Sequence, residues 1–212
     1  MRPTVGPISS VTVIARGRLE RLRALASRLV PPLAPEDRRL LSYVTIEAAN
    51  LWAQYSRVFY FSMALGARDA TGRRVVALPA NDVESALDLA VYALRPNLAG
   101  TKRVWTKGEL PDWQNKGHLA RLVEIVGPVL WPEVDRAVSY STRVLSDLPT
   151  MRNFYAHKAE RAAKSARDLR RHYGITGAVS PHELLCSRPA FGADLLINEW
   201  LADLSAILSL MP

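Results

Sequence analysis

A long helical pattern between residues 35 and 66 limits the fold of this chain most strongly. Apolar residues occur there on most faces of a helix of about 30 residues, which is typical of a helix at the centre of a core. Glu36 and Asp37 in the first turn suit the helix dipole, so we expect the helix to begin here. Such a helix must be covered by other elements, because so much apolar surface is not stable in water.

The rest of the chain repeats apolar residues at intervals of three and four, which is the helical period. Asn81 is expected to cap the third helix. This pattern predicts an all-α, single-domain helical bundle with long helices and a long basic and aromatic loop. We divide it into an N-terminal arm and first helix (residues 1–35) and a helical domain (36–212). The other helices are expected at about 17–30, 82–94, 116–126, 133–146, 151–173 and 191–210.

Composition excludes several classes of protein. Hydrophobic residues make up 49% of the 212 residues and charged residues 23%, which excludes a disordered chain. Cys186 is the one cysteine, so neither an internal disulfide nor a cysteine-based zinc site is expected. The histidines lack metal-ligand spacing, and no P-loop, GxGxxG or GxSxG motif occurs, so we predict no metal and no cofactor. No signal peptide or membrane-spanning run is visible, which favours a cytoplasmic protein without a membrane partner.

The net charge of +8 favours a polyanionic partner, and most of it lies on one predicted helix. Residues 152–171 hold seven basic and two acidic side chains, which leaves five of the eight net charges there. One interpretation is a phosphate-binding track for RNA, and the alternative is a solvated basic face. The candidate RNA contacts on this helix are Lys158, Lys164, Arg167 and Arg171.

The predicted loop at 95–115 places cations beside tryptophans. Lys102, Arg103 and Trp105 are its candidate RNA contacts, because indoles stack on bases while cations pair with phosphates. The alternative is that the loop tryptophans pin the loop to the core.

The segment from Arg152 to His157 is an Arg-x4-His motif in which Asn153 follows the arginine. RNA is cut without metal when its 2′-hydroxyl attacks the adjacent phosphate. This reaction needs a proton acceptor or donor with a pKa near 7, and a cation that balances the charge developing on the phosphate. Histidine and arginine meet these needs. A second Arg-x4-His spacing, from Arg167 to His172, is interpreted as a coincidence, with His172 as a surface or helix-end residue.

The first motif, in an all-α chain of this length, resembles the HEPN superfamily of helical-bundle proteins. The stretches Asn50–Arg57, Gly108–Trp113 and Asn198–Trp200 are similar to a bacterial branch of it. The resemblance implies a metal-independent endoribonuclease, of the kind found among toxins and antiphage effectors. Arg152 would stabilise the scissile phosphate, His157 would act in proton transfer, and Asn153 would orient the reacting groups or form hydrogen bonds.

The resemblance also implies a homodimer in which two Arg–His motifs form one composite cleft. Arg152 and His157 lie about 140° apart around an ideal helix, so one helix does not aim both at one atom. An antitoxin or defence-system protein is a further expected partner. Some family toxins are modified on a tyrosine two residues after the histidine, where this chain has Ala159.

Two alternatives to the endoribonuclease stay open at this point. One is a non-catalytic HEPN-like module that binds RNA or a partner protein. The other is a helical interaction protein whose basic face is merely solvated.

Overall fold

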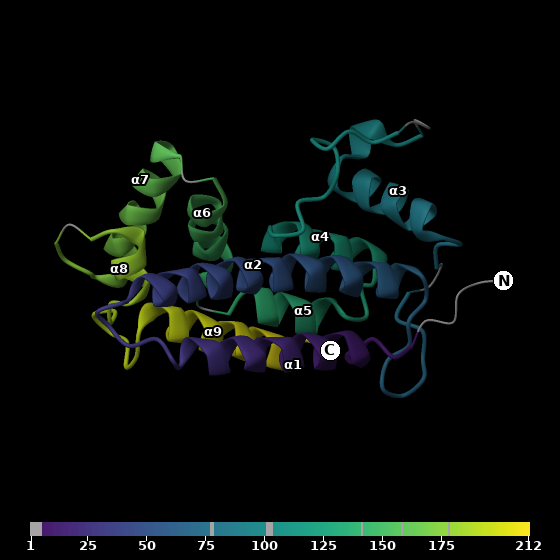
Figure 1. The fold of residues 1–212 in the computed structure, drawn as a ribbon. Helices are drawn as coiled ribbons and strands as arrows, with labels where there is room; N and C mark the ends of the chain where they lie inside the picture. The colour runs from purple at the N-terminus through teal and green to yellow at the C-terminus, as the bar shows by residue number, and fades with distance from the viewer. Residues whose placement is uncertain (1–5, 77–78, 101–103, 141, 158, 178) are drawn as a thin grey trace. The chain divides into compact units, whose positions relative to one another are not determined.

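The computed structural model describes residues 6–76, 79–100, 104–140, 142–157, 159–177 and 179–212, and they form helices joined by turns and loops (Figure 1). Within these ranges β structure is limited to isolated bridges at Arg68, so the predicted all-α, single-domain fold is confirmed. No helix in the described ranges is long and apolar enough to cross a membrane. The α-helices are α1 (Ser9–Ala26), α2 (Pro35–Ala64), α3 (Val83–Leu94), α4 (Lys116–Val126), α5 (Trp131–Val138), α6 (Val144–His157), α7 (Glu160–Asp168), α8 (Pro181–Leu185) and α9 (Leu196–Leu210), with 3-10 turns η1 (Pro96–Leu98) and η2 (Leu169–Tyr173).

The chain forms two compact units that interleave in sequence. Unit 1 consists of Met1–Ala15, Trp52–Tyr140 and Ile207–Pro212, and unit 2 consists of Arg16–Leu51 and Ser141–Ala206. Three helices, α1, α2 and α9, therefore contribute residues to both units. The predicted boundary between residues 35 and 36 stays a prediction.

Unit 1 is built around the aromatic C-terminal half of α2. The hydroxyl of buried Tyr60 donates to the carbonyl oxygen of Ala86 in α3 at 2.8 Å, so its polar end is satisfied inside the core. Burial also raises the pKa of this phenol. Gly127 follows α4, where a Cβ atom would lie 2.2 Å from the sulfur of Met63, so no larger residue fits there without a shift.

Unit 2 holds the helices that carry the Arg-x4-His motif. Leu19, Leu22 and Ala26 of α1 are buried at the expected helical spacing. The helix α7 packs against both α6 and α8. Gly174 ends η2 in the left-handed conformation, with φ 63°.

The predicted helix at 151–173 is wrong in its start and in its continuity, whereas its end before Gly174 agrees with η2, which ends at Tyr173. The helix α6 begins at Val144 and includes Pro149, which was expected to precede it. It ends at His157, and Ala159 is extended, with φ −73° and ψ 146°, before α7 begins. One proline removes one backbone hydrogen bond, and burial of Leu145, Leu148 and Met151 offsets that loss.

Smaller corrections concern other helix ends. Asp82, not Asn81, is the N-cap of α3, and its carboxylate accepts the backbone N–H of Ser85 at 2.7 Å. The predicted helix at 133–146 is divided between α5 and α6, while α1 begins earlier and α9 begins later than expected.

Candidate functional site

A groove between α6 and α7 in unit 2 contains two of the three motif residues. Asn153 and His157 lie four residues apart, which puts them on one face of α6, and both line the groove. Arg161 of α7 lines it as well and was not singled out from the sequence. The groove has a volume of about 470 Å³ and is completed by Thr150, Ala159, Ala162 and Ser165.

The end of α6 explains why His157 is accessible. His157 is the last residue of the helix, and its side chain is exposed. The break after it turns the chain, so that Arg161 returns along the groove from α7. An imidazole and a guanidinium therefore border the same space, a pairing suited to proton transfer beside an anion.

Arg152 lies next to this groove but is not one of its lining residues. Its guanidinium donates a hydrogen bond from Nη1 to the side-chain oxygen of Asn153 at 3.2 Å. Its Nε atom is buried and has no hydrogen-bond partner among the described residues. An unpaired buried donor of a cation is costly, so an anion that draws Arg152 toward it would relieve this cost.

Within the basic segment at 152–171, the described candidate RNA contacts lie on α7 and η2. Lys164, Arg167 and Arg171 are all exposed. Arg171 lies 3.8 Å from Asp168, an exposed pair that contributes little to stability. Lys158 lies outside the described residues.

The loop before α4 is anchored to α3 through Trp105. The indole N–H of Trp105 donates to the carboxylate of Asp88 at 2.7 Å, and the ring meets Tyr92 edge-on at 5.6 Å. This half-buried anchor favours the pinning interpretation for Trp105, whose RNA contact stays a prediction. Lys102 and Arg103 lie outside the described residues.

The sequence missed a cluster around Asp147 in unit 2. This carboxylate is only 3% exposed, and its Oδ2 atom accepts hydrogen bonds from Tyr173 at 2.9 Å and from Arg143 at 3.2 Å. The Nδ1 atom of His172 also lies 3.2 Å from Oδ2. His172 does lie at a helix end, as expected, but it is tied to a buried anion. The sequence did contain one indication of this cluster: Asp147 lies on the apolar face of α6, three residues after Val144. A carboxylate at such a position is expected to be buried and paired.

This Asp147 cluster is a hydrogen-bond network that links α6, η2 and α9. The hydroxyl of Tyr173 also accepts the indole N–H of Trp200 at 2.8 Å. Burial, and then the charge of Asp147, raise the pKa of Tyr173, so this phenol stays protonated. We assign the cluster a stabilising role because its hydrogen bonds are internal to the fold.

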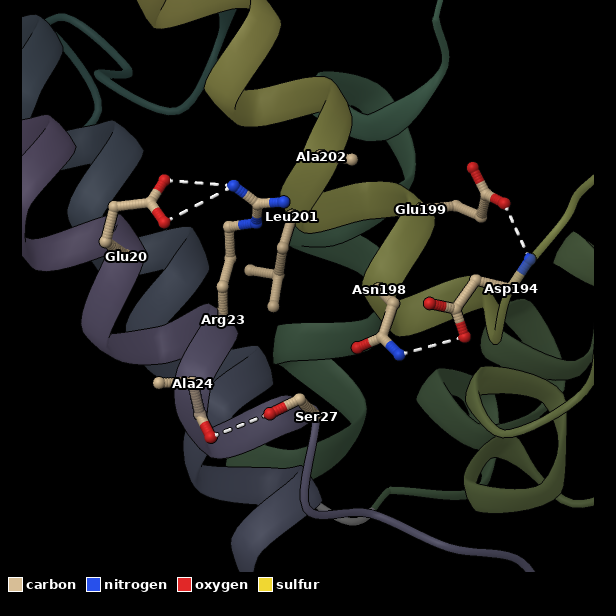
Figure 2. A pocket seen from close by; sticks show the side chains of 9 residues that line it. All are labelled: Glu20, Arg23, Ala24, Ser27, Asp194, Asn198, Glu199, Leu201 and Ala202. Carbon is tan, nitrogen blue, oxygen red and sulfur yellow. Dashed lines mark hydrogen bonds and ion pairs between the residues drawn. The ribbon is translucent and has the colours of Figure 1, made fainter.

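A further pocket of about 450 Å³ lies between α1 and α9 (Figure 2). Its polar side chains are occupied with near neighbours. Arg23 pairs with Glu20 at 3.0 Å, and Glu199 accepts the backbone N–H of Asp194 at 2.9 Å. These interactions favour helix packing as the role of the pocket.

Cys186 is expected to react slowly, because burial, assisted by the charge of Asp37, raises the pKa of its thiol to about 11. At pH 8 the native protein should be alkylated more than about a hundredfold more slowly than a free cysteine, since only the thiolate reacts. The rate should rise about tenfold per pH unit below the pKa. Mass spectrometry after iodoacetamide treatment measures it, with the denatured chain as control. Rapid labelling of the folded protein at pH 7 would contradict this assignment.

No group of three or more metal-ligating side chains is present in the described parts of the chain. Comparisons with protein-family models, curated proteins and solved structures find no match to this chain.

Proposed function

We propose that this protein is a HEPN-type endoribonuclease that cleaves RNA without a metal ion, as a toxin or antiphage effector. The observation that carries the proposal is the groove in which Asn153, His157 and Arg161 meet, with Arg152 bonded to its rim. Exposed cations also lie on α7, which lines this groove, and on η2, and they suit an RNA backbone.

The proposed reaction is an internal transfer at phosphorus. The 2′-oxygen attacks the neighbouring phosphorus and loses its proton, and the bond from phosphorus to the 5′-oxygen breaks. The products carry a 2′,3′-cyclic phosphate and a 5′-hydroxyl. His157 moves a proton to or from the reacting oxygens, while Arg152 and Arg161 balance the charge that develops on the phosphate.

A second copy of the chain completes the proposed site. Arg152 and His157 lie on different sides of α6, because five residues correspond to about 140° of rotation. Two copies related by a two-fold axis would bring Arg152 of one copy toward the groove of the other. An antitoxin or another defence protein that covers this groove would inhibit the enzyme.

The test is cleavage of single-stranded RNA in the presence of EDTA. We expect fragments that end in a 2′,3′-cyclic phosphate, and no cleavage of the same oligonucleotide with 2′-O-methyl groups, because the attacking hydroxyl is blocked. RNA binding without cleavage would replace the enzyme with a non-catalytic RNA-binding module. Growth arrest on expression, relieved by His157→Ala, would support the toxin role.

A further inference from the structure

Unit 1 contains a groove that the proposed cleavage reaction does not use. It has a volume of about 530 Å³, within the range of small-ligand sites. It is formed by the C-terminal half of α2, the start of α3 and the loop at 107–114. Its apolar lining residues are Ala53, Val83, Leu87, Leu110 and Pro111, together with the rings of Phe61 and Trp113.

The two aromatic rings form a stacking surface in this groove. The centroids of Phe61 and Trp113 lie 5.8 Å apart, with the ring planes tilted by 44°. Tyr60, buried beneath, supports Trp113 at 5.7 Å. Both lining rings are half-buried, so their positions are fixed while part of each ring faces the groove.

Two exposed cations flank the rings. The guanidinium of Arg57 lies 5.8 Å from the centre of the Phe61 ring, and Lys107 lines the groove from the loop. The carboxylate of Asp112 also lines it but accepts the backbone N–H of Gln114 at 3.1 Å, within its own loop.

We propose that this groove binds one nucleotide of a single-stranded RNA. The base packs against Phe61 and Trp113, and the adjoining phosphate pairs with Arg57 and Lys107. Aromatic side chains beside cations bind single strands in this way, whereas an uncharged apolar peptide would leave both cations unused. The choice of RNA rests on the proposed function, but binding here is separate from the chemistry at His157.

The experiment measures the affinity of the whole protein for a short single-stranded 2′-O-methyl RNA by fluorescence anisotropy. This probe cannot be cleaved by attack of the 2′-oxygen, so binding is read alone. We expect Trp113→Leu to weaken binding by about tenfold, since one base loses its stacking partner. Arg57→Gln and Lys107→Gln should each weaken it several-fold and reduce the salt-dependence slope by about 0.7.

Matched controls make the outcome decisive. Arg121→Gln removes an exposed arginine of α4 that pairs with Glu124 outside the groove lining, so it should leave the affinity within twofold. Duplex RNA should bind Trp113→Leu as it binds the wild type, because its bases are already stacked. Unchanged affinity of the folded Arg57→Gln and Lys107→Gln variants would overturn the proposal, as would a free mononucleotide that binds as tightly as the oligonucleotide. Binding of the 2′-O-methyl probe and cleavage of unmodified RNA are separate measurements, so a failure of the cleavage proposal is recognised separately from a failure of this one.

Discussion

His157→Ala is expected to reduce RNA cleavage by at least about a hundredfold, because proton transfer by a positioned side chain contributes 10²- to 10⁴-fold to such reactions. Arg152→Ala should reduce cleavage by a similar factor through loss of charge stabilisation. His157 is exposed at the end of α6, so its removal should leave the fold intact. The rate of single-turnover cleavage in EDTA, with circular dichroism as the check on folding, measures both effects.

Arg121→Ala is the control for this experiment. Arg121 is an exposed residue of α4 in unit 1 that pairs with Glu124 at 2.7 Å, and it lines neither of the two proposed RNA grooves. It should leave cleavage unchanged. Full activity in both His157→Ala and Arg152→Ala would reject this groove as the site, whatever the protein binds.

The second large effect is expected on stability. Asp147→Ala should lower the free energy of unfolding by about 2–4 kcal/mol, because it removes a buried carboxylate that accepts several hydrogen bonds, whereas its partners Arg143 and His172 remain open to solvent. His172, Arg143 and Tyr173 all lose the oxygen to which they bond. For a chain of this size, the melting temperature should fall by about 10 °C. Thermal and urea unfolding of the purified protein measure the change.

Two further variants are compared with Asp147→Ala: one removes the charge of Asp147 but keeps its shape, and the other removes an exposed carboxylate elsewhere. Asp147→Asn keeps an acceptor oxygen, so it should lose about half as much stability as the alanine variant. Asp168→Ala removes an exposed partner of Arg171 and should cost less than about 1 kcal/mol. If Asp147→Ala and Asp168→Ala have the same melting temperature, the Asp147 cluster does not stabilise the fold.

The positions of α2, α3 and α4 were predictable, because apolar periodicity depends on each helix alone. The N-terminal boundary of α2 and both boundaries of α4 agree with the sequence pattern. The break after His157 was not predictable, since Ala159, Ala162 and Ala163 favour helix by propensity. Tertiary packing overrides them by turning α7 toward α6 and α8.

The candidate site was predictable only in part for a similar reason. The motif identified Asn153 and His157. Arg161 reaches the same groove only because the helix breaks between His157 and Arg161. Asp147 and His172 are 25 residues apart, and nothing in their local sequences specifies that they meet. The groove of unit 1 likewise depends on contact between Phe61 and Trp113. These residues are far apart in the sequence, and the helical periodicity of each segment does not reveal that they meet.

The interleaving of the two units has a consequence for synthesis on the ribosome. Unit 1 needs residues 207–212, which are translated after all of unit 2, and the side chain of Thr12 donates to the carbonyl oxygen of Pro212 at 2.9 Å. Unit 1 therefore completes its fold only after unit 2 has emerged, although most of its sequence is made first. A nascent chain halted before residue 207 would hold a unit 1 that lacks the buried Ile207, Leu208 and Met211, and would be a target for chaperones or proteases.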